Sequence, residues 1–440
     1  MSRVLVIGAG VTGLVAAVRL ARAGVGVTVV NKGVGGLQLS QGTVDVLGYA
    51  PAPEPAGVAA GAAAAGDAGS TRPAVTRVGD PLAAVAALAA SDPTHPYSTI
   101  GVDAVRDGLD FLREAVGADL LVGTADANYH LPTAVGAVRP TCLAQPSMVA
   151  GNCVDGATFL IVGLRRLKDF HAALVAGNLS RTTLPDGGRL KARHVVVDVP
   201  DRREADTNAL SYARAFDTEE FRTRFAAEVK PLIAPGETVG FPAMLGLKNR
   251  GAWRDLEQNL GCPVFEIPLP PPSVPGMRLN DALMAAARAA GVRFVNGSWV
   301  QSARTEGGRV VSLTVGTAGR PQELTADAFL HAAGGFESGA LSLNSFGEVK
   351  ETLFDLPLSG TDQPLIHGEY WGAEQPLFAV GAMADESMRP VGADGVPVYD
   401  NLHVAGGILA GAHRWREKSG EGIALGSAMK ATDAIMRELA

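Results

Sequence analysis

The stretch that decides the fold is RVLVIGAGVTGLVAAVRLARAGVGVTVVN, residues 3–31. Its apolar run at 3–7 is continuous, which predicts a strand buried on both faces of a parallel sheet. A glycine-rich turn follows, then a helix from Val11 to Ala23 and a second apolar strand, VGVTVV, at 25–30. The chain is therefore expected to begin with the strand–turn–helix–strand unit of a Rossmann-like fold.

The turn between the first strand and the helix is a GxGxxG motif, GAGVTG at 8–13. Gly8 permits the tight turn, Gly10 lets the backbone approach a pyrophosphate, and Gly13 lets the helix pack closely on the sheet. The helix N-terminus adds amide donors and positive potential. In this context the motif predicts a dinucleotide site and, through the pyrophosphate, FAD. The alternative is a structural glycine-rich turn.

The end of the second strand departs from the usual pattern. About 20 residues beyond the glycines, an acidic residue usually holds the adenosine ribose. This chain has Asn31 and Lys32 there. An amide bonds a hydroxyl less strongly than a carboxylate does, and Lys32 adds a positive charge near the phosphates. The departure weakens the case for a full adenine dinucleotide.

Four more segments are candidates for contact with a cofactor. GGLQLSQGTVD at 35–45 follows the second strand, HAAGG at 331–335 and NLHVAGG at 401–407 end apolar strands, and SGEGIA at 419–424 opens a last helix expected at 421–438. A helix N-terminus near a flavin ring stabilises negative charge on the reduced ring. An ordinary polar loop is the alternative for 35–45. The candidate cofactor residues in these segments are Gly36, Ser40, Gly42, Gly334, Gly335, Gly406, Gly407, Gly422 and Ile423.

Composition limits the kind of protein. The chain has 440 residues, a hydrophobic fraction of 47% and a formal net charge of -7, so more than one globular domain is expected and nucleic-acid binding is not. The three cysteines are far apart, which argues against a zinc site, an iron–sulfur cluster or a disulfide framework. Neither a signal peptide nor an apolar run of ~18–20 residues is visible. A cytoplasmic location is expected, with membrane contact only through a partner.

The middle of the chain predicts a second α/β domain. From about 157 to 268, apolar strands such as TFLIVGL alternate with helical patterns such as RRLKDFHAALVAG at 165–177. The expected fold is α/β: a Rossmann-like flavin-binding domain assembled from both chain ends, with an inserted α/β domain. The expected boundaries are 1–50 and 270–440 for the flavin-binding domain, 51–90 for an Ala/Pro/Gly-rich excursion that turns helical, and 91–269 for the inserted domain.

These motifs, taken in order, carry a family resemblance. The chain resembles flavoproteins of the fumarate reductase and glycerol-3-phosphate dehydrogenase kind, and most closely the family of the B-type subunit of anaerobic glycerol-3-phosphate dehydrogenase. The segments that resemble it are NKGVGGLQLSQGTVDVL, YHLPTAVGAVRPTCLA, LPPPSVPGMRL, GAMADESMRP and DNLHVAGGILAGAH. The resemblance implies a flavoprotein with FMN as the family-level alternative to FAD, beside a catalytic flavoprotein subunit and an iron–sulfur subunit. It also implies a peripheral position at the inner face of the cell membrane as an alternative to a purely cytoplasmic one.

Oxidation of a secondary alcohol needs a proton acceptor while hydride moves to the flavin, and a phosphate-bearing substrate needs a cationic partner. The candidate catalytic residues are His413 and Arg414, between the last glycine-rich strand end and the final helix, and Arg389. His331 and His403 lie in apolar strands and are interpreted as core histidines. No metal ligands are expected.

The leading hypothesis is a flavoprotein subunit of an sn-glycerol-3-phosphate:quinone oxidoreductase, which oxidises glycerol 3-phosphate to dihydroxyacetone phosphate or relays its electrons. One alternative is a stand-alone flavin dehydrogenase or reductase for another small substrate. Another is a non-catalytic electron-transfer or scaffold subunit, for which Asn31 is the support.

Overall fold

The computed structural model describes residues 2–51, 75–117, 119–201, 206–369 and 372–440. It divides into two compact units. The first contains residues 1–35, 45–115 and 283–440, and the second contains 36–44 and 116–282. The low-complexity part of the 51–90 excursion, residues 52–74, lies outside the described residues.

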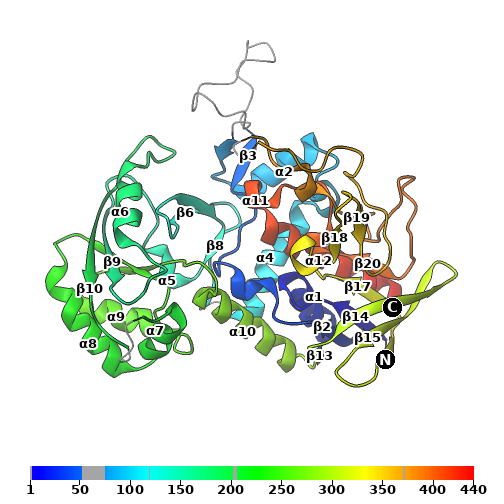
Figure 1. Ribbon diagram of the computed structural model, residues 1–440, viewed down its shortest axis with the longest axis horizontal. Coiled ribbons are helices and arrows are strands. Elements are labelled where there is room, and N and C mark those ends of the chain that lie inside the picture. The colour runs from blue at the N-terminus through cyan, green and yellow to red at the C-terminus, as the bar shows by residue number, and fades with distance from the viewer. Residues whose placement is uncertain (1, 52–74, 118, 202–205, 370–371) are drawn as a thin grey trace, which may run out of the picture. The chain divides into compact units, whose positions relative to one another are not determined.

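The first unit is built on a five-stranded parallel sheet in the order β13-β2-β1-β17-β20. Its strands are β1 (Arg3–Ile7), β2 (Gly26–Asn31), β13 (Arg293–Asn296), β17 (Ala328–His331) and β20 (Leu402–Val404). Both ends of the chain therefore contribute neighbouring strands, as Figure 1 shows by the blue and the yellow-to-red segments lying together. This confirms the expected Rossmann-like unit and its assembly from both chain ends.

Helices of the first unit pack closely on one another, with α12 in contact with both α1 and α4. α1 (Val11–Arg22) contacts α12 (Gly420–Leu439) through Arg19, whose Nη1 donates to the Met429 carbonyl at 2.9 Å. A Cβ on Gly108 would lie 2.9 Å from the Leu425 Cβ, so α4 (Val102–Val116) lies directly against α12. The remaining helices of this unit are α2 (Pro81–Ser91), α3 (Pro96–Ile100) and the short α11 (Arg414–Glu417).

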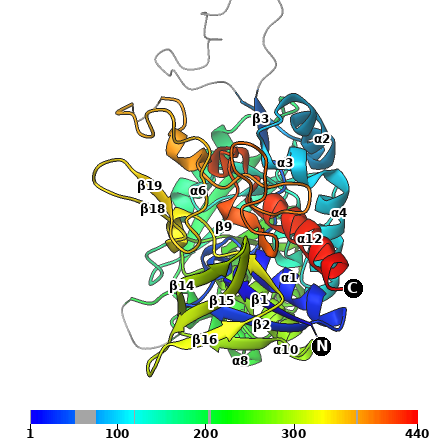
Figure 2. The same cartoon turned by 90° about the vertical axis from the view of Figure 1, so that its right-hand side faces the viewer.

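A second, antiparallel sheet of the first unit contains β14 (Trp299–Glu306), β15 (Arg309–Gly316) and β16 (Gln322–Thr325), seen together in Figure 2. The β14–β15 hairpin turns at Gly307–Gly308, where both glycines have positive φ. Asn401 anchors it, since its Oδ1 accepts from the Val310 N–H and its Nδ2 donates to the Val310 carbonyl, both at 2.9 Å. Two small hairpins complete this unit: β3 (Tyr49–Pro51) with β4 (Val75–Arg77), and β18 (Leu341–Leu343) with β19 (Val349–Glu351).

The second unit has its own four-stranded parallel sheet, in the order β10-β9-β11-β12. The strands are β9 (Thr158–Leu164), β10 (Lys191–Val197), β11 (Thr238–Pro242) and β12 (Val264–Ile267). Its helices are α5 (Pro146–Val149), α6 (Ala172–Arg181), α7 (Ala209–Phe216), α8 (Glu219–Val229) and α9 (Ala252–Leu260), and α10 (Val274–Ala289) begins in it. Two short ladders pair β5 (Val122–Gly123) with β8 (Leu143–Ala144) and β6 (Tyr129–Pro132) with β7 (Val138–Thr141). The inserted α/β domain thus has its predicted parallel sheet.

Two details differ from the sequence expectations. The helix expected at 165–177 begins at Ala172, because the Arg165 N–H still bonds the Val197 carbonyl and Leu167 and Phe170 are buried in the core before the helix starts. The second unit begins at Val116 rather than 91, since α3 and α4 pack against α12 of the first unit. The segment 36–44, expected in the flavin-binding domain, groups with the second unit.

Candidate functional site

The carboxyl ends of the parallel strands define the candidate site in the first unit. In the register of the sheet, Ile7 pairs with both Val30 and His331, and His331 pairs with Val404. The residues that follow these strands therefore leave the sheet at one edge. In open α/β sheets this is the edge at which ligands bind.

The three glycines of the GxGxxG motif have different surroundings. Gly8 has φ +106°, and a Cβ there would collide with the Ala332 carbonyl. A Cβ on Gly13 would collide with the Gly8 carbonyl. A Cβ on Gly10 would meet no atom within 4 Å, and Gly10, the N-cap of α1, has no side chain to satisfy the helix amides. Gly8 and Gly13 are thus needed for packing, whereas Gly10 leaves the helix N-terminus open to an external anion.

The glycine pairs that end β17 and β20 lie against each other and against this helix. A Cβ on Gly406 would collide with Thr12 Oγ1, in the first turn of α1, and a Cβ on Gly407 would lie 3.3 Å from the Gly334 Cα. The structure thus brings together predicted residues from three distant segments: Gly8, Gly10, Gly13, Gly334, Gly335, Gly406 and Gly407. We refer to these seven residues as the glycine cradle.

Arg414 faces the glycine cradle. Its Nη1 lies 3.0 Å from the Cβ position of Gly407, and its Nη2 lies 3.4 Å from that of Gly335. Nη1 is buried and has no hydrogen-bond partner among the described residues. Burial lowers the pKa of the Arg414 guanidinium, an effect that the negative charges of Glu337 and Glu417 partly offset.

Asn31, at the end of β2, has one satisfied and one unsatisfied polar atom. Its Nδ2 donates to the Gly33 carbonyl at 2.8 Å, while its Oδ1 is buried without a partner among the described residues. This orientation leaves an acceptor free for a hydroxyl group. The neighbouring Lys32 is exposed to solvent.

His413 precedes α11, and Glu417 fixes its backbone. The His413 N–H donates to Glu417 Oε1 at 2.9 Å, and the His413 Nδ1 is buried without a partner among the described residues. The Ser419 hydroxyl donates to Glu417 Oε2 at 2.8 Å. Burial alone would raise the pKa of Glu417, but hydrogen bonds from His95, Ser419 and His413, together with the charge interaction with His95, lower it.

His95 is a residue that the sequence reasoning missed. Its Nδ1 accepts from the Tyr97 N–H at 3.1 Å, so Nε2 carries the ring hydrogen and faces Glu417 Oε2 at 3.2 Å. The signal in the sequence is DPTHPY at 92–97, a histidine held between two prolines.

Arg389 lies in a local turn. Its Nε and Nη2 contact Asp385 Oδ2 at 2.9 and 2.8 Å, and the other oxygen of Asp385 accepts from the Ser387 and Arg389 amides. The side chain is therefore committed to Asp385. Its contact with a substrate stays a prediction.

Gly422 and Ile423 have packing roles at the start of α12. The Gly422 N–H donates to the Asp45 carbonyl at 3.0 Å, and a Cβ there would collide with the Tyr97 hydroxyl. The Ile423 side chain is buried. Contacts of these two residues with a flavin stay predictions.

The segment 36–44 is a tight turn within the second unit. The Ser40 hydroxyl donates to the Leu37 carbonyl at 2.9 Å and accepts from the Gly42 N–H at 3.2 Å. Gly42 has φ +72°, and a Cβ there would collide with Pro275. Gly36 has open space around its Cβ position. The roles of Gly36, Ser40 and Gly42 toward a cofactor stay predictions.

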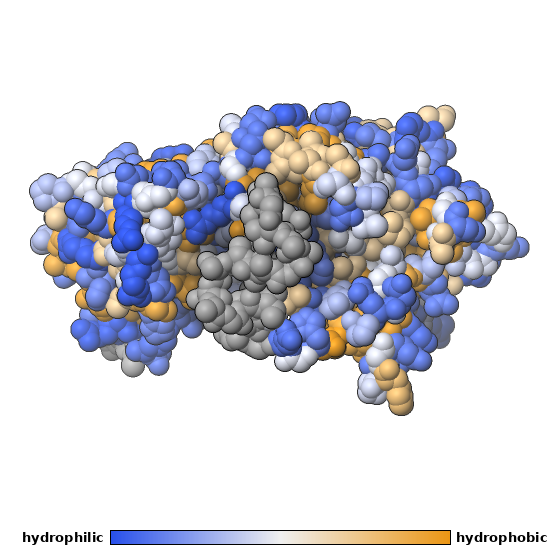
Figure 3. Space-filling model, turned by 90° about the horizontal axis from the view of Figure 1, so that it is seen from above, coloured by the Kyte–Doolittle hydropathy of each residue, from blue (hydrophilic) through white to orange (hydrophobic). Residues whose placement is uncertain are grey.

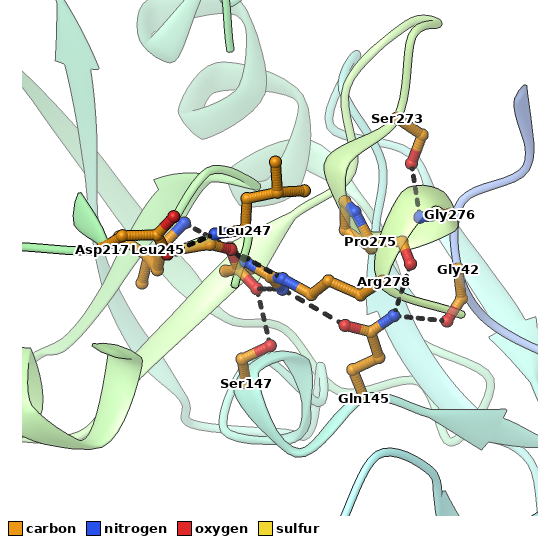
Figure 4. A network of polar contacts seen from close by, with 12 residues as sticks. Gly42, Gln145, Ser147, Asp217, Leu245, Leu247, Ser273, Pro275, Gly276 and Arg278 are labelled. Atoms are coloured by element: carbon orange, nitrogen blue, oxygen red, sulfur yellow. Dashed lines mark hydrogen bonds and ion pairs between the residues drawn. The ribbon is translucent and has the colours of Figure 1, made fainter. Parts of the chain in front are cut away.

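A buried polar network, also missed by sequence reasoning, holds this turn (Figure 4). The Gln145 Nε2 donates to the carbonyls of Gly42, at 3.2 Å, and Pro275, at 2.8 Å. The Gln145 Oε1 accepts from Arg278, whose guanidinium forms a two-oxygen ion pair with Glu266 at 2.6 and 3.0 Å. The side chains of Arg278 and Glu266 are only 4% and 0% exposed, so this is a fully buried charge pair.

Comparison with known proteins shows which family the chain resembles. The model of the FAD binding domain family matches residues 3–423. The probable B-type subunit of the anaerobic glycerol-3-phosphate dehydrogenase of Halobacterium salinarum is 33% identical over 445 residues, covering 98% of this chain and 97% of that protein. The B-type subunit of the anaerobic glycerol-3-phosphate dehydrogenase of Yersinia pestis is 28% identical over 452 residues, covering 99% and 98%. The solved 3-ketosteroid Δ1-dehydrogenase of Sterolibacterium denitrificans aligns along the whole of both chains with 11% identity and a TM-score of 0.45, a likeness too loose to carry an argument.

Proposed function

This chain belongs to the FAD binding domain family and to the family of B-type subunits of anaerobic glycerol-3-phosphate dehydrogenase, and from this premise we propose that it oxidises sn-glycerol 3-phosphate to dihydroxyacetone phosphate. The predicted family and the predicted flavin are thereby confirmed, with FAD as the flavin. The observation that carries the substrate proposal is the buried, unpartnered Nδ1 of His413, next in sequence to Arg414, whose Nη1 is also buried without a partner among the described residues.

The residues at the edge of the five-stranded sheet fit FAD. Gly10 leaves space at an uncapped helix N-terminus, which suits a diphosphate, and the Asn31 Oδ1 is an acceptor that suits a ribose hydroxyl. The half-buried Arg414 adds a positive charge. When bound, FAD accepts the hydride equivalent that leaves the substrate carbon.

Two groups of the chain are assigned to the substrate in this proposal. His413 takes the hydroxyl proton at Nδ1 as the C–H bond breaks, because a neutral imidazole nitrogen without a partner is an available acceptor. Arg389 is the candidate for the substrate phosphate, which would compete with Asp385 for its guanidinium.

Partner subunits are the second part of the proposal. The relatives' names identify one subunit of a multi-subunit dehydrogenase, and we propose that this chain works beside a catalytic flavoprotein subunit and an iron–sulfur subunit, and that electrons pass from its flavin to the iron–sulfur subunit and then to quinone. The first unit exposes large apolar side chains that suit such contacts, and Figure 3 shows apolar surface on one face of the molecule. Among them are Trp299, Phe346, Ile366, Phe378 and Trp415.

Membrane association is proposed to be indirect. Among the described residues, the helices are all too short or too polar to cross a bilayer. We propose a cytoplasmic protein held at the inner face of the cell membrane by a partner.

The test is anaerobic addition of glycerol 3-phosphate to the purified, flavin-loaded chain. Direct catalysis predicts bleaching of the flavin absorbance without any partner, and His413→Asn is expected to slow the bleaching while leaving reduction by dithionite unchanged. Bleaching that requires the partner subunits would instead establish an electron relay. Bleaching by a different alcohol, but not by glycerol 3-phosphate, would favour a stand-alone dehydrogenase.

A further inference from the structure

Arg414 occupies the part of the first unit where the glycine cradle meets the N-terminus of α1. Its Nη1 lies 3.0 Å from the Cβ position of Gly407. The preceding residue, Gly406, is in contact with Thr12, in the first turn of α1. The residue that the guanidinium contacts, Gly407, thus directly follows the residue that contacts the first turn of α1. In Rossmann-like folds this turn holds a pyrophosphate.

Arg414 forms no ion pair with a carboxylate among the described residues. Glu337 and Glu417 contribute negative potential at the guanidinium, and Glu337 Oε2 lies 3.2 Å from the Cβ position of Gly335, which Arg414 Nη2 also approaches, but neither carboxylate hydrogen-bonds Arg414 among the described residues. Glu417 is engaged instead by His95, Ser419 and the His413 amide. The Nη1 atom is nevertheless buried without a partner, and buried donors in proteins are normally paired, so an anionic acceptor is expected to come from a ligand.

The position of Arg414 is set before any ligand binds. Glu417, three residues further on in the same short helix α11, accepts hydrogen bonds from residues on both sides of that helix and from the distant His95. A Cβ on Gly411 would collide with the Thr94 carbonyl, so the 92–97 turn also packs against the chain just before α11. The backbone that carries Arg414 is therefore fixed on both sides of the residue by contacts of its neighbours.

We propose that Arg414 is a cofactor-binding residue whose guanidinium donates to the diphosphate of bound FAD. This assignment replaces the catalytic role that the sequence suggested for Arg414. It rests on FAD binding, and it is independent of whether the chain itself oxidises glycerol 3-phosphate.

The test compares three flavins that differ in their phosphates. Apoprotein is titrated with FAD, FMN and riboflavin, and binding is followed by the change in flavin fluorescence. Arg414→Met keeps the length of the apolar stem and removes the charge. It is expected to weaken FAD and FMN by about 10- to 100-fold, the effect of losing a charge-assisted hydrogen bond, and to leave riboflavin unchanged because riboflavin has no phosphate.

Two other variants serve as controls. Arg222→Met removes a different buried guanidinium, one paired with Asp255 in the second unit, and is expected to leave the affinities of all three flavins unchanged. Asn31→Leu removes the acceptor at the end of β2 and is expected to weaken FAD alone, because only FAD has the adenosine ribose. Arg414→Lys keeps the charge but not the fork of donors, so its FAD affinity should lie between that of the wild type and that of Arg414→Met.

An equal loss of affinity for all three flavins in Arg414→Met, or no loss for any, would overturn the assignment. If Arg414→Met does not fold, Arg414→Lys decides: FAD affinity equal to that of the wild type overturns the assignment, and a selective loss for FAD and FMN supports it. A wild-type chain that binds none of the three flavins would overturn the proposed function as well. A flavin-binding chain that glycerol 3-phosphate does not reduce would overturn the proposed function and leave this assignment standing.

Discussion

The Nε2 of His95 lies 3.2 Å from Oε2 of Glu417, although the two residues are 322 positions apart in the sequence. The contact joins the turn at 92–97 to the short helix that carries Arg414. The His95 side chain is 2% exposed and that of Glu417 is 16% exposed, so solvent does not readily replace either partner. This pair connects a proline-rich turn with no cofactor motif to the edge of the sheet that we propose binds the flavin.

We expect His95→Leu to destabilise the first unit by about 1–3 kcal/mol, because it leaves a buried carboxylate short of one donor. Weaker FAD binding should accompany this loss, since α11 would no longer hold Arg414 against the cradle. The amide side chain introduced by His95→Gln can still donate to Glu417 and accept from Tyr97. This variant should therefore recover most of the stability and most of the FAD affinity. The measurements are thermal unfolding and FAD titration.

A matched control for this variant is His403→Leu, which breaks the contact of His403 with Glu438, near the opposite end of α12. This change should lower stability and leave FAD affinity intact. Equal loss of FAD affinity in the two leucine variants would contradict a specific role for His95.

The buried pair of Arg278 and Glu266 gives a prediction for the second unit. Arg278→Met should destabilise this unit by about 3–5 kcal/mol, because Glu266 would stay buried without its counter-charge. The double variant Arg278→Met/Glu266→Leu should be more stable than Arg278→Met alone, since no unpaired charge then remains. Denaturant unfolding of the three proteins checks this order, and a double variant less stable than Arg278→Met would contradict it.

Much of the fold could be predicted because it depends on local patterns. The continuous apolar strands, the GxGxxG turn and the strand ends in glycine are short stretches whose physical meaning is readable without the rest of the chain. From them the sequence predicted the sheet edge where Gly8, Gly334 and Gly407 meet. Asn31 was likewise singled out, and the structure leaves its Oδ1 without a partner among the described residues; its contact with a ribose stays a prediction.

The features of the fold and the site that the sequence did not predict depend on contacts between residues far apart in the chain. Nothing near His95 indicates that its partner is Glu417, and Arg278 lies in a helix whose apolar pattern says nothing of Glu266. The start of the second unit at Val116 follows from the packing of α4 on α12, more than 300 residues later, as the contact of Gly108 with Leu425 shows. Such pairings are set by tertiary packing rather than by propensity or motif.

Tyr212 gives a prediction for the stability of the protein at alkaline pH. Burial, with the negative charges of Asp201 and Asp198, raises the pKa of Tyr212 to about 12 from its usual 10.0, against the opposing effect of Arg166. Because the folded-state pKa lies above the unfolded one, the neutral phenol contributes stability that is complete below pH 10 and is lost as the pH rises toward 12. Tyr212→Phe should unfold with a weaker pH dependence across this window, measured by denaturant titrations at its two ends. An unchanged pH dependence would contradict this assignment.

Gly8 and Gly10 should respond differently to one added methyl group. Gly8→Ala places a Cβ against the Ala332 carbonyl at φ +106°, so the variant is expected to fold poorly. Gly10 has φ -76° and ψ -176°, which alanine readily adopts, and its Cβ position is open. Gly10→Ala should therefore cost only about 1 kcal/mol or less of stability, as expected for an alanine N-cap. Its methyl group would nevertheless occupy space that the FAD diphosphate needs, so FAD and FMN should bind more weakly while the melting temperature changes little. A Gly10→Ala protein with wild-type FAD affinity would show that the diphosphate does not approach this turn.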